Sequence, residues 1–257
     1  MEHSFARNYE SASLKAAAFP TLRFYSRLSA IFWNASKVAK AGKYDGERWA
    51  YDSLLVGRLL EDMGIHISIE GTENLAFDGP CVFEANHMST LETLFLPCII
   101  QPLRDVTFVV KRQLLGYPCL GPVLAAREPI ALGRSNPRED LKLVMEDGQR
   151  ILESGRSVII FTQGTRRSGV EPADFNSLGV KLARKANVPV VPIALKTDAW
   201  GEGSLIKDIG PISPKFPIHV RFGAPVEIKG AGREEHGVIV DFIKNSFDSW
   251  VAADGKA

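Results

Sequence analysis

The stretch CVFEANHMSTLE occupies residues 81–92 and joins a short apolar segment to a polar turn and then to the start of another apolar segment. Residues 81–85 predict a buried strand and the segment from Leu91 predicts a helix, so His87 lies at a strand end and Glu92 in the first helical turn. A carboxylate there can hold the far ring nitrogen of a histidine that acts as a general base. The same spacing arises by chance, so a purely structural role for His87 stays open.

Apolar strand-like segments alternate with helical patterns along most of the chain. The predicted strands are 65–70, 81–85, 106–110, 158–161, 188–195 and 219–222. The predicted helices between and after them are 91–100, 140–153, 178–186 and 234–251. This alternation predicts an α/β domain over residues 64–257, with a mixed, largely parallel sheet flanked by helices. Residues 116–122 and 210–217 are rich in Pro and Gly and predict surface connections.

Two amphipathic helices are predicted ahead of this domain, within a leader of residues 1–63. Larger apolar residues recur every three or four positions over 22–38, and 48–63 predicts a second helix that ends at Gly64. Residues 1–43 hold seven Lys or Arg and two Glu, a net charge of +5, whereas the rest of the chain sums to −4. This helical hairpin therefore suits an anionic membrane surface, while a first helix docked on the core explains the same pattern.

Composition excludes several classes of protein. The 257 residues are 45% hydrophobic and 24% charged, as in ordinary globular proteins and unlike disordered chains. Lys and Arg number 31 against 30 Asp and Glu, so bulk nucleic-acid binding is not expected. The three cysteines form no close pair, which predicts reduced thiols in a cytoplasmic protein without zinc or redox chemistry. Neither a signal peptide nor a membrane-crossing helix is expected.

A second polar block follows the predicted strand at 158–161. The sequence FTQGTRR, residues 161–167, predicts a glycine-containing loop with two adjacent arginines. Gly164 lets the backbone approach a ligand, Thr165 offers a hydroxyl, and the planar guanidinium of Arg166 suits a phosphate. The block therefore predicts an anion-binding loop, with a solvated turn as the alternative.

Two further basic groups also follow apolar segments. Lys111 comes directly after the predicted strand at 106–110, and Arg134 closes the apolar run IALGR at 130–134. Because ligand sites of α/β proteins gather at strand ends, we expect these cations and Arg166 to converge if their strands are neighbours. Such a site would suit a phosphorylated substrate.

Four blocks, in order, resemble those of the glycerolipid acyltransferase family, whose best-known branch is the 1-acylglycerol-3-phosphate acyltransferases. The family's Asn-His, four residues and Asp resembles residues 86–92, and its apolar run closed by Arg resembles 130–134. Its Phe-Pro-Glu-Gly-Thr-Arg resembles 161–166, and its apolar strand with a late proline resembles 188–193. The resemblance covers residues 65–225.

This resemblance implies transfer of a fatty acyl chain from acyl-CoA or acyl-acyl carrier protein to a lysophospholipid hydroxyl. The default acceptor is 1-acylglycerol-3-phosphate, and no metal or bound cofactor is implied. By position, His87 would be the general base and Glu92 would orient it. The implied substrate-binding residues are Asn86, Lys111, Arg134, Gln163, Gly164, Thr165 and Arg166. The family's helical hairpin resembles residues 21–63 and implies peripheral or monotopic attachment to the cytoplasmic face of a membrane, with acyl carrier protein as a further partner.

The chain departs from the family pattern at a few motif positions. Glu92 stands where Asp is usual, which adds one methylene and keeps the charge. Thr162 and Gln163 replace the Pro and Glu of the third block, and Gly133 stands where Asp is frequent. These changes leave three alternatives open: an acyltransferase for another lysolipid or amphiphilic acceptor, an acyl-thioester hydrolase, or a non-catalytic homologue that binds acyl chains or membranes.

Overall fold

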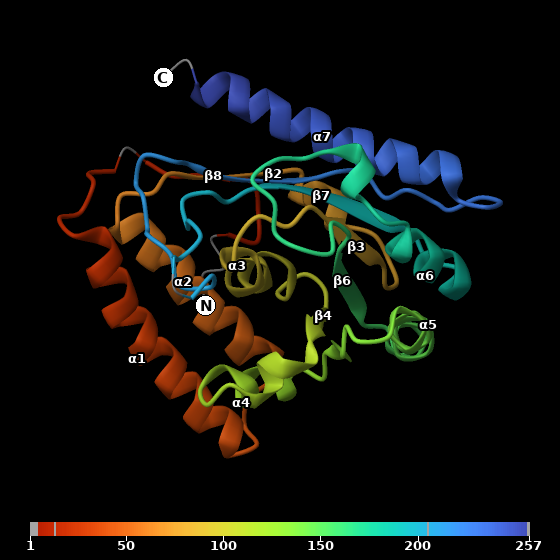
Figure 1. The fold of residues 1–257 in the computed structure, drawn as a ribbon, viewed down its shortest axis with the longest axis horizontal. Coiled ribbons are helices and arrows are strands. Elements are labelled where there is room, and N and C mark those ends of the chain that lie inside the picture. Colours follow the sequence, from red (N-terminus) through yellow and green to blue (C-terminus); the bar gives the residue numbers. More distant parts are fainter. Residues whose placement is uncertain (1–4, 13, 205, 256–257) are drawn as a thin grey trace.

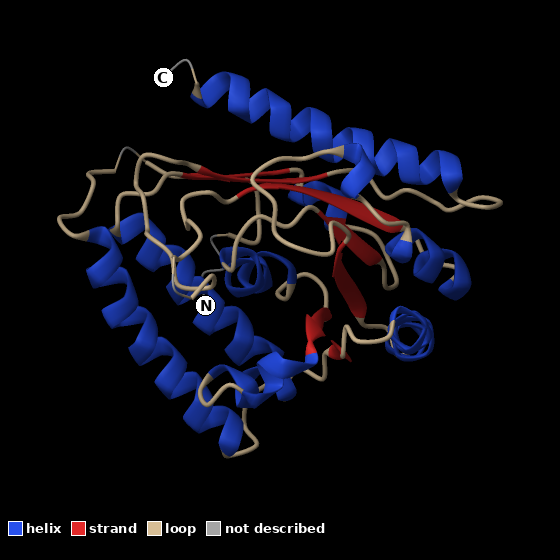
Figure 2. Ribbon diagram, viewed as in Figure 1, coloured by secondary structure: helices blue, strands red, loops and turns tan. Residues whose placement is uncertain are grey.

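The computed structural model describes residues 5–12, 14–204 and 206–255, and over these residues the chain forms an eight-stranded sheet with helices on both faces (Figures 1 and 2). The strand order is β1-β2-β8-β7-β3-β6-β4-β5. Adjacent strands are parallel except in the β1–β2 and β7–β8 pairs. The bounds are β1 Tyr9–Glu10, β2 Ile67–Glu70, β3 Val82–Ala85, β4 Val106–Lys111, β5 Ile130–Leu132, β6 Ser157–Phe161, β7 Val190–Lys196 and β8 Ile218–Phe222.

Helices on the two faces build two hydrophobic clusters. One cluster draws on the first three helices, through residues such as Phe24, Leu60 and Phe95, and the other on the last three, through Val144, Leu182 and Ile243. The α-helix bounds are α1 Pro20–Lys40, α2 Gly46–Asp62, α3 Leu91–Ile100, α4 Leu120–Ala125, α5 Pro137–Glu153, α6 Leu178–Ala186 and α7 Arg233–Asp254. Short 3-10 helices are Thr72–Leu75, Arg112–Gly116 and Pro172–Asp174. Figure 1 shows α7 along one face and α1 to α4 on the other.

The predicted α/β class and the mixed, largely parallel sheet are confirmed, and each predicted strand and helix of this domain overlaps an observed one. The sequence did not predict β1 or β5, which are two and three residues long. The surface connection predicted over 116–122 is wrong at its end, because α4 begins at Leu120 and buries Gly121. Pro122 sits in the first turn of α4, where a helix does not need the missing N–H. All three cysteines are free, and two are buried.

Strand β3 occupies the middle of the sheet between β6 and β7, and this position fixes the direction in which the chain leaves it. All four of its residues are buried, as expected for a strand covered by helices on both faces. Phe83 and Ala85 join the cluster under α1 to α3, while Val82 joins the one under α5 to α7. The alternation follows from the two-residue period of a strand.

The predicted helical hairpin corresponds to α1 and α2, which pack against each other, while α4 packs on α1 and α3 packs on α2. Asp45 caps α2, its carboxylate accepting from the backbone N–H of Arg48 at 2.8 Å. Phe24 and Leu28 of α1 are buried, whereas Leu22 and Trp33 are 72% and 58% exposed. The predicted leader of residues 1–63 includes 1–4 and 13, which lie outside the described residues. Over the described part of the chain, no helix is both long and apolar enough to cross a membrane.

Candidate active site

The carboxyl ends of β3, β4 and β6 lie at one edge of the sheet because these strands are parallel. His87 follows β3, Lys111 ends β4, and the loop from Thr162 to Arg167 follows β6. The register brings Ala85 opposite Phe161, so the polar segments after both strands start at the same level. The sequence blocks therefore meet although they lie far apart in the chain.

His87 and Glu92 form a hydrogen-bonded pair, called the dyad below. Nδ1 of His87 lies 2.5 Å from Oε2 of Glu92. The Glu92 side chain is fully buried, whereas that of His87 is 20% exposed. The imidazole stacks on Phe161, with ring centroids 4.4 Å apart and planes 20° apart. Among the described residues Nε2 of His87 has no hydrogen-bond partner, so one ring nitrogen is held and the other is available.

Three donors fix the second oxygen of Glu92. The backbone N–H groups of Met88 and Ser89 donate to Oε1, each at 2.8 Å, and the hydroxyl of Thr197 donates to it at 2.6 Å. Glu92 also lies in the first turn of α3, where the helix dipole favours negative charge. The extra methylene of Glu relative to Asp is thus accommodated with both oxygens bonded.

Asn86 and Gln163 use their amides to hold the two loops in place. Asn86 exchanges two hydrogen bonds of 2.8 Å with the backbone N–H and carbonyl of Leu195 on β7. The side-chain oxygen of Gln163 accepts from the backbone N–H of His87 at 2.8 Å, and its NH₂ donates to Gly169 at 3.1 Å. These two residues, predicted to bind substrate, therefore have protein partners on both amide atoms. Their contact with substrate stays a prediction.

Lys111, Arg134 and Arg166 form a group of cations next to the dyad, called the basic cluster below. Burial lowers the pKa of Lys111, and the nearby charges of Arg134 and Arg166 lower it further. Such an influence places the charges of both arginines within electrostatic reach of Lys111. Burial also lowers the pKa of Arg134. The sequence analysis expected these three cations to converge, and this arrangement agrees with that expectation. A bound anion would offset the repulsion between the cations.

The loop carrying Gly164 and Thr165 is open to solvent beside the basic cluster. Gly164 has φ of +67° and nothing within 4 Å of the position of a Cβ atom. Its carbonyl accepts from Nη1 of Arg134 at 2.9 Å, which links the second block to the third. Arg134 itself has φ of +60°, and the carboxylate of Asp140 accepts from its backbone N–H at 2.8 Å. The geometry leaves the Thr165 side chain exposed.

Asp208 was not singled out from the sequence, yet it enters the basic cluster. Its Oδ1 accepts from Nη2 of Arg166 at 2.5 Å, while Nη1 of Arg166 donates to the hydroxyl of Thr90 at 2.9 Å. The following segment contacts α1, since the hydroxyl of Tyr25 donates to the carbonyl of Gly210 at 2.8 Å. Nothing in the local sequence around Asp208 marks it, because its partner is 42 residues away in the chain.

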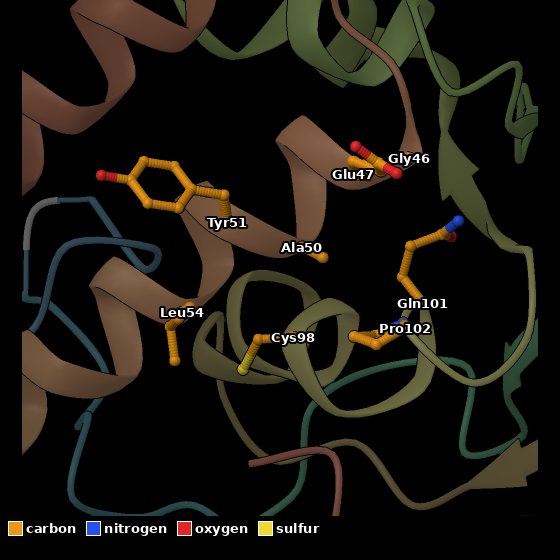
Figure 3. A pocket seen from close by; sticks show the side chains of 8 residues that line it. All are labelled: Gly46, Glu47, Ala50, Tyr51, Leu54, Cys98, Gln101 and Pro102. Atoms are coloured by element: carbon orange, nitrogen blue, oxygen red, sulfur yellow. The ribbon is translucent and has the colours of Figure 1, made fainter. Parts of the chain in front are cut away.

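A separate pocket of about 330 Å³ lies between α2 and the far end of α3 (Figure 3). Its lining residues are Gly46, Glu47, Ala50, Tyr51, Leu54, Cys98, Gln101 and Pro102. Glu92 lies in the first turn of α3, at the opposite end of that helix, so the pocket does not contain the dyad. Within the described ranges of the chain, no group of three or more His, Cys, Asp or Glu side chains is arranged to hold a metal ion.

The sequence is similar to those of known acyltransferases. A 1-acyl-sn-glycerol-3-phosphate acyltransferase of Pseudomonas aeruginosa is 37% identical over 148 residues, which cover 58% of this chain and 55% of that protein. One of Limnanthes alba is 29% identical over 168 residues, 65% of this chain and 58% of that protein. The chain thus spans little more than half the length of these relatives.

The fold also matches a solved structure. The crystal structure of the 1-acyl-sn-glycerophosphate acyltransferase PlsC from Thermotoga maritima superposes with a TM-score of 0.69 at 19% identity, covering 90% of this chain and 94% of that one. The sequence profile of the acyltransferase family matches residues 66–196, which include the dyad and the basic cluster. This match spans half of the chain, and the chain therefore belongs to the acyltransferase family.

Proposed function

We propose that the protein transfers a fatty acyl chain from an acyl thioester to the free hydroxyl of 1-acylglycerol-3-phosphate, giving phosphatidate. The observation that carries the proposal is the dyad, in which a buried carboxylate holds one nitrogen of His87 beside a cluster of three cations. The names of the Pseudomonas and Limnanthes relatives support the same reaction. Because the chain spans only part of their length, the activity is a proposal for this chain.

His87 acts as the general base of the proposed reaction. Its Nε2 accepts the proton of the acceptor hydroxyl while that oxygen attacks the thioester carbonyl carbon and forms the new C–O bond. When the tetrahedral intermediate collapses, the C–S bond breaks and the imidazolium returns the proton to the departing thiolate. Glu92 stabilises the imidazolium between these steps and keeps the imidazole in the tautomer that exposes Nε2.

The basic cluster binds the acceptor phosphate. Lys111 supplies a point charge, and the guanidinium groups of Arg134 and Arg166 supply paired N–H donors that match phosphate oxygens. Gly164 and Thr165 bring an open stretch of backbone and a hydroxyl to the same place. Asn86 and Gln163 contribute by fixing the segments that carry His87 and Arg166.

The acyl donor is acyl-CoA or acyl-acyl carrier protein, and it is a substrate rather than a bound cofactor. The proposed step uses only the donor thioester and the acceptor hydroxyl as reactants. If the donor is acyl-acyl carrier protein, the carrier is also a protein partner.

We place the protein at the cytoplasmic face of a membrane, attached peripherally or monotopically. In this proposal residues 1–63 make the membrane contact and residues 64–257 form the catalytic domain. Exposed Leu22 and Trp33 on α1 suit the headgroup boundary, and Nζ of Lys37 lies 5.2 Å from the ring centroid of Trp33. The apolar residues can enter the lipid while the lysine stays with the phosphates.

Thiol release from palmitoyl-CoA tests the proposal, measured with and without lysophosphatidate in anionic vesicles. We expect release that requires the acceptor and that falls by orders of magnitude in His87→Ala, with folding retained. His236→Ala is the matched control, because His236 also precedes an acidic residue by five positions but lies within α7. Release without acceptor would identify a hydrolase instead. Absence of release with CoA, carrier-protein donors and other lysolipids would indicate a non-catalytic binder.

A further inference from the structure

Thr197 is the first residue after β7 and lies 105 positions from Glu92, yet its side chain meets that of Glu92. It is 1% exposed, and its hydroxyl lies between Oε1 of Glu92 at 2.6 Å and Oγ of Ser89 at 3.0 Å. Among the described residues, the Thr197 side chain makes no hydrogen bond to the open nitrogen of His87 or to the basic cluster. It therefore acts on the site only through another side chain.

The hydrogen bonds around Thr197 form a chain in which each group donates to the next, from Leu91 through Ser89 and Thr197 to Glu92. The backbone N–H of Leu91 donates to Oγ of Ser89 at 3.2 Å, and the hydroxyl of Ser89 donates to that of Thr197. A hydroxyl has a single hydrogen, and an ionised carboxylate only accepts. Ser89 therefore leaves the Thr197 hydrogen to point at Oε1 of Glu92.

We propose that Thr197 is a positioning residue of the dyad, whose hydroxyl holds the Glu92 carboxylate aimed at His87. This inference rests on the proposed function, because it assumes that His87 is the base. A glutamate has one more rotatable bond than an aspartate, so its carboxylate needs more donors to stay in one orientation. The hydroxyl of Thr197 adds a charge-assisted bond to those from the two backbone N–H groups.

Removal of this hydroxyl has a definite kinetic signature. Without the Thr197 hydroxyl, Oε1 of Glu92 keeps only its two backbone donors, and the carboxylate turns more easily away from Nδ1 of His87. The imidazole is then held less often in the orientation that exposes Nε2. We therefore expect a lower kcat with little change in substrate affinity, because Thr197 acts only through Glu92.

Thr197→Val tests this directly, since it removes the hydroxyl and keeps the shape. The matched control is Thr107→Val on β4, whose fully buried hydroxyl donates to the carbonyl of Arg127 at 2.8 Å. We expect Thr197→Val to lower kcat by about tenfold to a hundredfold, with both KM values within about threefold of wild type. Thr107→Val should leave kcat within about threefold of wild type.

Thr197→Ser keeps the hydroxyl and should restore kcat to within about threefold of wild type. If Thr197→Val does not fold, Ser89→Ala provides the test, because it removes the donor that orients Thr197 and should also lower kcat while both KM values stay near those of wild type. The charged neighbours Arg166 and Asp208, bound to Thr90 and to each other, are unchanged in all these variants.

Two results would overturn the inference: a Thr197→Val enzyme that behaves like Thr107→Val, or a serine variant as impaired as the valine variant. A parallel His87→Ala assay separates this failure from failure of the proposed function. If His87→Ala is inactive and Thr197→Val is normal, only the role of Thr197 is wrong. If His87→Ala keeps full turnover, the proposed function itself fails.

Discussion

Oδ1 of Asp208 lies 2.5 Å from Nη2 of Arg166. An arginine of the proposed acceptor site is therefore already paired with a carboxylate of the same chain. The same carboxylate acts on Lys111, where it opposes the lowering of the pKa by burial and by the neighbouring arginines. Asp208 thus lies among the charges that are proposed to receive a phosphate. The acceptor must displace this carboxylate or share donors with it.

Asp208→Asn should therefore lower the KM for lysophosphatidate several-fold, because it removes a negative charge that competes with the phosphate. The effect should shrink as salt is added, since this contact is partly exposed. Asp174→Asn is the matched control, because Asp174 pairs with Arg167 at 3.4 Å, outside the basic cluster. A higher KM in Asp208→Asn would mean instead that Asp208 orients Arg166 for the substrate.

Lys111 gives the acceptor site a pH dependence of its own. Burial, then Arg134 and Arg166, lower the pKa of its ammonium group, so it loses its charge at a lower pH than a free lysine does. The KM for lysophosphatidate should therefore rise on the alkaline side, while the KM for the donor should not. Lys111→Arg keeps the charge and should flatten this limb. An unchanged alkaline limb in that variant would assign it to another group.

The buried carboxyl group of Glu84 should make the stability of the fold depend on pH. Burial raises the pKa of this fully buried carboxyl on β3 to about 8, against the opposing backbone N–H groups of Val180 and Gly179. The folded protein therefore retains a proton that the unfolded chain releases as the pH rises above 4.5, the ordinary pKa of a glutamate. The free energy of unfolding contributed by this group falls as the pH rises through that window and levels off above the folded pKa.

Glu84→Gln removes this titration. The Tm of the variant minus that of wild type should increase between about pH 5 and about pH 8, as measured by scanning fluorimetry. Glu146→Gln, at an exposed position on α5, should give a constant difference. Parallel Tm curves for Glu84→Gln and wild type would show that Glu84 stays ionised throughout.

We expect α1 to bind anionic vesicles through its exposed apolar side chains Leu22 and Trp33. The double variant Leu22→Ser/Trp33→Ser should bind anionic vesicles at least about tenfold more weakly in a sedimentation assay, because it removes two large apolar side chains from the lipid contact. Val238→Ser/Val251→Ser is the matched control, since these valines are 58% and 47% exposed on α7, on the other face of the sheet. Equal losses in both double variants would exclude α1 as the specific contact.

The sequence predicted the elements that have strong local patterns. The apolar runs that became β3 and β6 and the periodic stretch that became α1 carry their own hydrophobic signal. Strand β5 has only three residues, too few for an alternation to stand out, and it forms because β4 offers a parallel edge beside it. Helix α4 was not predicted because Gly and Pro usually interrupt helices. In α4 both residues lie in the first helical turn, where Pro is tolerated.

The sequence motifs of the candidate site could be predicted, but the hydrogen bonds and ion pairs that join them could not. His87, Glu92 and Arg166 stand in motifs whose chemistry can be inferred from residue type and spacing. Thr197 and Asp208 do not, because each acquires its role from a partner brought near by the sheet. The only local sign of Thr197 was a polar residue at the end of an apolar strand, which is a common pattern.

The two hydrogen bonds between Asn86 and Leu195 join parts of the chain 109 residues apart, and this separation has a consequence for synthesis on the ribosome. A nascent chain translated only through β6 already contains the histidine and the glutamate, but not β7 or the threonine that follows it. Contacts of such long range are made late, after the intervening chain has been produced. The proposed dyad should therefore become fully held only once the chain has been translated through β7 and Thr197.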